Sequence, residues 1–355
     1  MNPGAQRPLP RAARLPLALA AGVLLALGQA PYDLWSLAFA GLVFAIWLFL
    51  RAPGGFHAIG TGWAVGLGYF GLSLGWIVEP FMVDAATTGW MAPFGLLGLA
   101  GGLALFWALA FWLAGHATHR PVLALVLAWS AAELARAFVF TGFPWGLVGY
   151  LWAPSPAIQW VSVVGPHGLT LMSIALAGYA ALVIRDFRAI RAGILALSLA
   201  VLLVGGVLLT PPPQDLTDRP VVRLVQPNAP QHQKWDPAHI PTFFERQLAF
   251  TAAPMPDGAR PALIVWPETA VPSLLNRAQD ELTAMAEAAQ GSPVAVGIQR
   301  AEPGGRYFNS LALLDGFGDV VQVYDKHHLV PFGEYMPFAR VFERWNIFGL
   351  AARAS

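Results

Sequence analysis

The sequence predicts a multi-span α-helical membrane domain followed by an α/β domain outside the cytoplasm. Hydrophobic residues make up 56% of the 355 residues and charged residues only 12%, about half the roughly 25% of ordinary soluble domains. The charge is also uneven, because residues 1–210 carry 14 of the 41 charged side chains and residues 211–355 carry 27. We therefore predict a membrane domain over 1–210, a proline-rich linker over 211–219 and a second domain over 220–355.

The first domain contains seven apolar segments of a length that suits membrane helices. A bilayer core takes about 20 apolar residues per helix, with a range of about 17–25. The first segment follows three arginines and resembles a signal peptide, but the six further segments favour a retained helix. Paired glycines in the third segment, at Gly62/Gly66 and Gly71/Gly75, suit close helix approach, with ordinary glycine enrichment of membrane helices as the alternative. The seven predicted spans are 15–30, 34–50, 56–78, 90–113, 121–139, 158–184 and 192–209.

Arginines in the loops predict the orientation of these spans. Cytoplasmic loops carry an excess of Lys and Arg, and the loops around 79–89 and 140–157 contain neither. The N-terminus is therefore predicted to be cytoplasmic, and seven spans then place residues 211–355 in the periplasm. One miscounted span would reverse that placement. The segments on the predicted cytoplasmic side contain Arg7, Arg11, Arg14, Arg51, Arg120, Arg185, Arg188 and Arg191.

Two ionisable residues, Glu133 and Arg136, lie on one face of the fifth predicted span. Ionisable groups at membrane depth are costly and commonly face a bundle interior or a functional cavity. The alternative is a mutually neutralised pair without a chemical role. The stretch 141–146 then breaks the helix, and its aromatic residues, Trp145 among them, suit either an interfacial anchor or a lipid entrance.

The second domain alternates strand and helix patterns, which predicts α/β layering. Apolar runs predict strands at 221–226 and 262–266, and two mixed patterns predict helices at 238–253 and 280–290. Three further strand patterns follow, at 294–299, 308–314 and 320–324.

Candidate catalytic residues follow two of these strands. Chemistry in such folds takes place at the carboxyl ends of strands, where Glu268, Lys326 and then Glu334 stand. The chain has two lysines, Lys234 and Lys326, against nineteen arginines, which favours a role for a compact point charge. A carboxylate base, an ammonium group for oxyanion charge and a second carboxylate suit acyl transfer. Spacing alone supports this weakly, and a nucleophile is missing.

Composition excludes several other kinds of site. The chain has no cysteine, which excludes disulfides and thiolate chemistry in these residues, and its net charge of +1 argues against nucleic acid as a partner. His327 and His328 are adjacent, so on a strand they point to opposite faces and make a poor metal pair. We expect no metal and no cofactor.

Two long motifs resemble the apolipoprotein N-acyltransferase family of the bacterial inner membrane. They are Trp266-Pro267-Glu268-Thr269-Ala270 and Tyr324-Asp325-Lys326-His327-His328-Leu329-Val330-Pro331-Phe332-Gly333-Glu334-Tyr335. Shorter stretches are similar to its other motifs: 226–228, 234–237, 308–310 and 141–146. The resemblance covers essentially the whole chain. It implies a nitrilase-like (carbon–nitrogen hydrolase) αββα sandwich carried on a multi-helix membrane domain.

The resemblance also implies an activity and a site. Such enzymes move an acyl chain from a phospholipid to the α-amino group of the diacylglyceryl-cysteine at the N-terminus of an apolipoprotein, through a thioester. By this resemblance Glu268 is the general base, Lys326 stabilises the oxyanion, and Glu334 orients the lysine. Trp235 and Asn309 then border the substrate pocket, with core packing and a strand-end hydrogen bond as the alternatives. Substrate binding is also expected of Arg136 and Trp145.

One departure from the family pattern concerns the nucleophile. The family's cysteine follows the lysine by some tens of residues and precedes a last membrane helix, and this chain contains neither. We therefore expect the chain to be truncated at its C-terminus and, as it stands, unable to form the thioester. Two alternatives remain open: a membrane-anchored amidase of the nitrilase type, and a catalytically dead lipid-binding scaffold. Transport is disfavoured, because the spans contain few polar groups besides Glu133 and Arg136.

Overall fold

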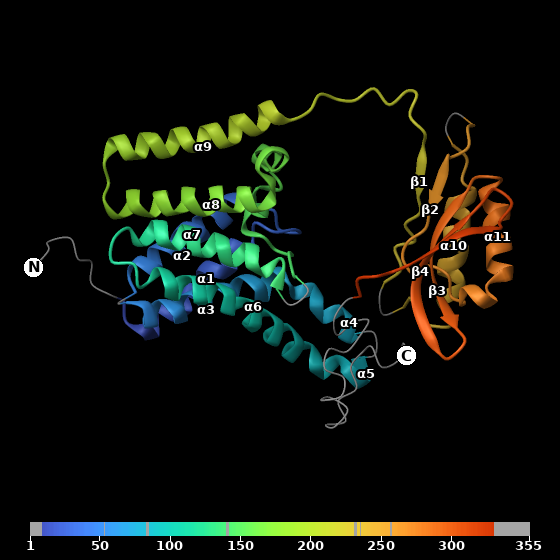
Figure 1. The fold of residues 1–355 in the computed structure, drawn as a ribbon, viewed down its shortest axis with the longest axis horizontal. Helices are drawn as coiled ribbons and strands as arrows, with labels where there is room; N and C mark the ends of the chain where they lie inside the picture. Colours follow the sequence, from blue (N-terminus) through green and yellow to red (C-terminus); the bar gives the residue numbers. More distant parts are fainter. Residues whose placement is uncertain are drawn as a thin grey trace, which may run out of the picture. The chain divides into compact units, whose positions relative to one another are not determined.

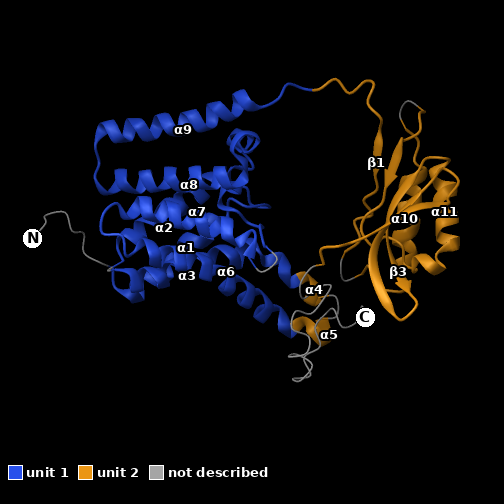
Figure 2. Cartoon of the chain, in the orientation of Figure 1, with its two compact units in different colours: residues 1–78, 90–213 blue, residues 79–89, 214–355 orange. Residues whose placement is uncertain are grey.

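The computed structural model separates the chain into two compact units (Figures 1 and 2). One unit comprises residues 1–78 and 90–213, and the other comprises 79–89 and 214–355. The short segment 79–89, expected as an outer loop of the membrane domain, thus groups with the second unit. The residues that the structure describes are 9–52, 54–82, 85–139, 142–230, 233–234, 236–255 and 258–329.

The first unit is built from long apolar helices, one within each of the seven predicted segments or overlapping it closely. Short turns of helix connect them: η1 (Gly75–Val78), α4 (Glu79–Met82), α5 (Ala85–Thr88), η2 (Gly89–Met91), η4 (Val148–Trp152) and η5 (Pro156–Trp160). The long helices are α1 (Arg11–Ala26), α2 (Trp35–Leu50), α3 (Gly55–Ser73), α6 (Ala92–Ala114), α7 (Pro121–Arg136), α8 (Val161–Arg185) and α9 (Ala189–Leu209).

Three helical stretches in the described residues are long and apolar enough to cross a membrane: Ala85–Ala114, Pro156–Arg185 and Ala189–Leu209. A fourth is added if Gly55–Ser73 and Gly75–Met82, which are bent by 65°, form one span. Helices α1, α2 and α7 have 16 residues each, which is about 24 Å of helix against a core of about 30 Å. The number seven for complete spans therefore stays a prediction.

Close packing of α3 on α6 depends on the first of the two glycine pairs. A Cβ on Gly62 would lie 2.7 Å from the Trp107 carbonyl oxygen, and one on Gly66 would lie 2.8 Å from the Ala104 Cα. Such contacts are too short for any side chain, so these glycines let the two backbones approach, as predicted. Gly71 and Gly75 have open space instead, as far as the described residues show, which agrees with the alternative of ordinary glycine enrichment.

The second unit contains a five-stranded sheet in the order β1-β2-β3-β4-β5. The first three strands are parallel, and β4 and β5 continue the sheet as antiparallel neighbours. Two helices pack on the sheet, α10 (Ile240–Ala252) and α11 (Gln279–Ala289), and η6 (Leu275–Arg277) precedes the second. The strands are β1 (Val222–Leu224), β2 (Leu263–Val265), β3 (Val294–Glu302), β4 (Arg306–Leu314) and β5 (Val320–Asp325).

The two faces of this sheet differ in what covers them. Alternate residues of the central strands, such as Val296, Ile298 and Ala312, are buried in one core with residues of α11. The opposite face carries exposed apolar residues, including Leu224 and Tyr324. The described residues thus contain one sheet with one helical layer (Figure 1), which is half of the predicted αββα sandwich.

Candidate active site

The loop after β2 carries Glu268 and is fixed to the sheet on both sides of that residue. The Trp266 side chain is buried, and its indole nitrogen donates to the Thr251 hydroxyl at 2.9 Å. The Trp266 amide donates to the Ala295 carbonyl, and the Ala270 amide donates to the Gly297 carbonyl, each at 2.8 Å. Only three residues lie between Trp266 and Ala270, whose amides are both bound to β3, so the backbone at Glu268 has little freedom.

Gly297 on β3 lets this loop lie directly on the sheet. A Cβ at Gly297 would lie 2.5 Å from the Glu268 Cα and from the Pro267 carbonyl oxygen. Real Cβ atoms do not approach other atoms so closely, so any larger residue would push the loop away. The glycine therefore sets the height of Glu268 above the sheet.

Lys326 reaches Glu268 from the end of β5. Strands β2 and β5 run in the same direction within the sheet, so their carboxyl ends meet at one edge. The Lys326 ammonium nitrogen lies 3.0 Å from Glu268 Oε1, and the side-chain amide of Asn309 on β4 donates to the same oxygen. The Lys326 amide also donates to the Asn309 carbonyl at 2.8 Å. The structure thus brings together three of the predicted site residues.

Lys234 is a fourth member of this site that the sequence did not assign to it. Its ammonium nitrogen donates to the main-chain carbonyl of Glu268 at 3.2 Å. Burial lowers the pKa of the Lys234 amine, and the Glu268 carboxylate offsets part of that change. The scarcity of lysine in the sequence could have indicated that Lys234 belongs to the site, since both lysines of the chain contact Glu268.

A cavity of about 180 Å³ lies beside the Glu268 loop. Its polar part includes Lys234, Thr269 and the side chain of Gln247, which is 3% exposed. The Oε1 of Gln247 has no hydrogen-bond partner among the residues that the structure describes. Aromatic and aliphatic side chains form the other walls, among them Phe243, Phe244 and Ile240. The cavity is therefore amphipathic.

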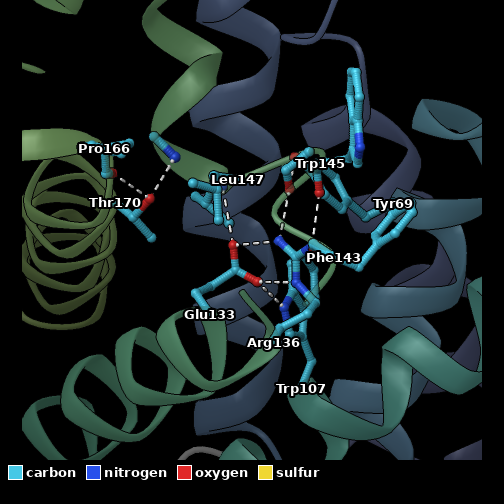
Figure 3. Close-up of polar contacts among 12 residues, drawn as sticks. Tyr69, Trp107, Glu133, Arg136, Phe143, Trp145, Leu147, Pro166 and Thr170 are labelled. Atoms are coloured by element: carbon cyan, nitrogen blue, oxygen red, sulfur yellow. Dashed lines mark hydrogen bonds and ion pairs between the residues drawn. The ribbon is translucent and has the colours of Figure 1, made fainter. Parts of the chain in front are cut away.

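The first unit contains a separate buried ion pair, Glu133 and Arg136 on α7 (Figure 3). Both side chains are at most 1% exposed. Arg136 donates two hydrogen bonds to the Glu133 carboxylate and three to the carbonyl oxygens of Phe143, Trp145 and Gly146. These five bonds match the five N–H groups of a guanidinium.

The carboxylate of Glu133 accepts four hydrogen bonds, two on each oxygen. It accepts hydrogen bonds from the Trp107 indole at 2.8 Å and from the Val148 amide at 3.2 Å, in addition to those from Arg136. The pair therefore satisfies its own charge and anchors the loop that follows α7. The substrate contact expected of Arg136 stays a prediction. Trp145, on that loop, is 58% exposed, and its ring lies 5.6 Å from that of Trp76.

The remaining two predicted site residues, Trp235 and Glu334, lie outside the described residues.

Two family models match this chain and together cover most of it. Residues 21–179 match the Apolipoprotein N-acyltransferase N-terminal domain, and residues 222–345 match the Carbon-nitrogen hydrolase family. Individual relatives include the apolipoprotein N-acyltransferase of Sinorhizobium fredii, which is 36% identical over 94% of this chain and 67% of its own length. That of Caulobacter vibrioides is 40% identical over 79% of this chain and 56% of its own length.

A helical domain of apolar segments joined to a carbon–nitrogen hydrolase domain defines the class of this protein. Within that second domain, the Glu268–Lys326 pair lies at the edge of the sheet formed by the carboxyl ends of β2 and β5. The chain belongs to the apolipoprotein N-acyltransferase family. It spans about two thirds of the length of the Sinorhizobium fredii relative.

Proposed function

We propose that the protein transfers an acyl chain from a membrane phospholipid to the α-amino group of the N-terminal diacylglyceryl-cysteine of apolipoproteins. The observation that carries the proposal is the geometry at Glu268, whose carboxylate is held by Lys326 and Asn309 at the edge of the sheet. Family membership supplies the substrates, as the curated relatives are apolipoprotein N-acyltransferases. The place of action is then the bacterial inner membrane, with residues 211–355 in the periplasm.

The first half of the proposed reaction forms a thioester. Glu268 takes the proton of a cysteine thiol, and the thiolate attacks an ester carbonyl of the phospholipid. Lys326 stabilises the oxyanion of the tetrahedral intermediate, because an ammonium that is already held in place needs no reorganisation as the negative charge develops. The proton returns from Glu268 to the departing lysophospholipid alkoxide. The cysteine is one that the family pattern supplies and these 355 residues do not contain.

The second half transfers the acyl group to nitrogen. The α-amino group of the acceptor attacks the thioester carbonyl, Glu268 accepts the proton of that amine, and the thiolate leaves as the amide forms. The same carboxylate thus serves both half-reactions, and Glu334 orients Lys326 in both. Trp145 and the loop held by Arg136 border the path of the lipid, and Trp235 borders the pocket.

The test uses the protein isolated from its native membrane. It is incubated with phospholipid that carries an isotopically labelled acyl chain and with a synthetic diacylglyceryl-cysteine peptide. We expect labelled N-acyl peptide from the wild type and from the control Glu287→Gln, which changes an exposed glutamate on α11. Glu268→Gln abolishes the transfer. If the protein hydrolyses a soluble amide while the peptide remains unlabelled, the amidase is favoured instead. If it binds phospholipid but turns over no substrate, the scaffold is favoured.

A separate measurement tests the part that the cysteine plays. Residues 1–355, purified alone and incubated with the labelled phospholipid, are expected to remain at their own mass, since they have no thiol to acylate. Intact mass spectrometry reports an acyl adduct directly. Transfer by residues 1–355 at the rate of the native-membrane protein would contradict the thioester mechanism.

A further inference from the structure

A second charged cluster lies next to Lys326, on the face of the sheet opposite to the Glu268 site. In register, Ser310 on β4 faces Asp325 on β5 and Ile298 on β3. Because side chains alternate between faces along a strand, Arg300, Ser310 and Asp325 share the helix-covered face of Ile298. Asn309 and Lys326 point to the other face, where Glu268 lies. We call Arg300, Ser310 and Asp325 the Arg300 cluster.

Within the Arg300 cluster, Arg300 and Ser310 bind the two oxygens of the Asp325 carboxylate. Arg300 donates from Nε to Oδ1 at 2.8 Å and from Nη2 to Oδ2, and the Ser310 hydroxyl donates to Oδ1 at 2.7 Å. This two-pronged arrangement fixes direction as well as distance. The Arg300 guanidinium also lies 4.2 Å from the ring centroid of Phe308. Arg300 and Ser310 lower the pKa of Asp325 to about 2, so its carboxylate is ionised and held.

Holding Asp325 has a geometric consequence for the next residue. A lysine side chain has four rotatable carbon bonds and does not fix its own direction. The direction of Lys326 therefore depends on its backbone, which is bound to the Asn309 carbonyl one position beyond the Ser310–Asp325 pair. With Asp325 tied to β3 and β4, the end of β5 stays in register and the ammonium reaches Glu268.

Holding Asp325 has an electrostatic consequence as well. Asp325 is the carboxylate nearest to Lys326 along the chain, and a freed Asp325 would compete with Glu268 for the ammonium. Arg300 neutralises that charge and occupies both of its oxygens. Both consequences favour the pairing of Lys326 with Glu268 over other arrangements.

We propose that Arg300 and Asp325, with Ser310, are positioning residues that direct the Lys326 ammonium to Glu268. They act through the backbone and charge of β5 and do not touch the reacting atoms. The importance of this pairing for catalysis rests on the proposed function. The pairing itself can be measured without any acyl transfer, so failure of one proposal is distinguishable from failure of the other.

The test exploits the fact that the chain has only two lysines. The purified protein receives a short pulse of acetic anhydride, and mass spectrometry gives the acetylation rate of Lys326. A lysine-containing peptide in the same tube is the external reference. An ammonium paired with a carboxylate stays protonated and reacts slowly. Glu268→Gln should therefore raise the acetylation rate of Lys326, and the size of that increase is the reference for the other variants. An acetylation rate unchanged by Glu268→Gln would overturn the pairing of Lys326 with Glu268.

Asp325→Asn is the decisive variant, and Glu302→Gln is its matched control. Glu302 also binds Arg300, but it is remote in sequence from Lys326. We expect Asp325→Asn to raise the Lys326 rate by on the order of threefold or more, and Glu302→Gln to leave it within error. A role in stability alone predicts a lower thermal midpoint with an unchanged labelling rate, which would overturn the proposal. An equal rise in Glu302→Gln would also overturn it.

Ser310→Ala serves as a milder variant if Asp325→Asn does not fold. It removes one of the hydrogen bonds to Asp325 and leaves the Arg300 fork in place. The expected Lys326 rate lies between those of the wild type and Glu268→Gln. A wild-type rate in a folded Ser310→Ala protein, together with failure of Asp325→Asn to fold, counts against the proposal.

Discussion

At the scale of single residues, the Glu268 carboxylate is held by the Lys326 ammonium, 3.0 Å from its Oε1, and by the side-chain amide of Asn309. Because Glu268 and Lys326 each follow a strand, the sequence predicted that they meet at one edge of the sheet. The contribution of Lys234 could not be predicted in this way, because it acts on the main-chain carbonyl of Glu268 from a segment without regular structure.

The lowered pKa of Asp325 predicts how the stability of the protein depends on pH. Its pKa falls from an ordinary 3.8 to about 2 in the folded protein. A lowered folded-state pKa means that the carboxylate contributes stability that is fully present above about pH 4. That contribution is lost as the pH falls from about 4 toward 2. The thermal midpoint of Asp325→Asn should therefore lie below that of the wild type above pH 4, and the two should converge toward pH 2.

The variant Arg300→Gln provides the control for this measurement. Arg300 is the main cause of the lowered pKa, so in its absence Asp325→Asn should change the midpoint little at any pH. A gap between wild type and Asp325→Asn that stays constant from pH 6 to pH 2 would contradict the assignment of the ion pair.

At the scale of elements, the sequence predicted which segments are helices and strands better than it predicted their ends. The apolar runs at 221–226 and 262–266 contain the strands Val222–Leu224 and Leu263–Val265, which are shorter. Apolar character marks burial, whereas a strand extends only as far as its neighbours pair with it. Helix α7 ends at Arg136 rather than near 139, because the Phe143 amide and the arginine side chain draw the chain into a turn.

The contacts of Arg136 with the loop after α7 could not be predicted from the sequence. Its spacing from Glu133 showed that the two residues share a face, and the ion pair is present. The three carbonyl oxygens that it binds belong to an irregular loop, and no periodic pattern in a sequence specifies where loop carbonyls point.

Removing Arg136 should destabilise the helical unit more than removing the whole pair. Arg136→Met leaves the Glu133 carboxylate buried without its counter-charge, which we expect to cost about 3–5 kcal/mol. The double variant Glu133→Leu/Arg136→Met leaves no unpaired charge, so its thermal midpoint in detergent should lie above that of Arg136→Met. Equal midpoints for the single and double variants would show that the burial of Glu133 is not what makes the loss costly.

Gly297 provides a test of how β3 positions the loop after β2. Gly297→Ala places a methyl group 2.5 Å from the Glu268 Cα, and overpacking of this kind costs about 1–3 kcal/mol. We expect a lower thermal midpoint and loss of acyl transfer in the protein from its native membrane. Gly71→Ala is the matched control: Gly71 lies in α3 with open space around its Cβ position, so this change should not lower stability. A fully active Gly297→Ala protein would contradict the positioning of Glu268 by this contact.

At the scale of the whole molecule, the uneven distribution of charge predicted a chain of two parts. Contacts separate the two units at the end of the proline run, between 213 and 214, and also assign residues 79–89 to the second unit. That assignment could not be predicted from composition, because such a short segment between two apolar helices has no distinguishing pattern. The described half of the αββα sandwich follows from strand and helix periodicity, whereas the family resemblance alone supplied the rest.

The orientation of the spans can be tested in residues 1–355, which contain no cysteine. A single cysteine can be introduced at Thr118, exposed between α6 and α7, or at Gln214, exposed after α9. If the N-terminus is cytoplasmic, a maleimide that crosses the outer but not the inner membrane should label Gln214→Cys in intact cells. Thr118→Cys should be labelled only after the inner membrane is opened. The opposite result would place residues 211–355 in the cytoplasm and exclude the proposed meeting with periplasmic lipoproteins.

The most direct test of the proposed activity is the mass of lipoprotein N-terminal peptides from cells without this protein. We predict that their diacylglyceryl-cysteine carries a free α-amino group and that the natural gene restores the N-linked acyl chain. The gene with Glu287→Gln should restore it as well, and the gene with Glu268→Gln should not. Fully N-acylated lipoproteins in the deleted cells, or restoration by Glu268→Gln, would contradict the claim that this protein acylates them through Glu268.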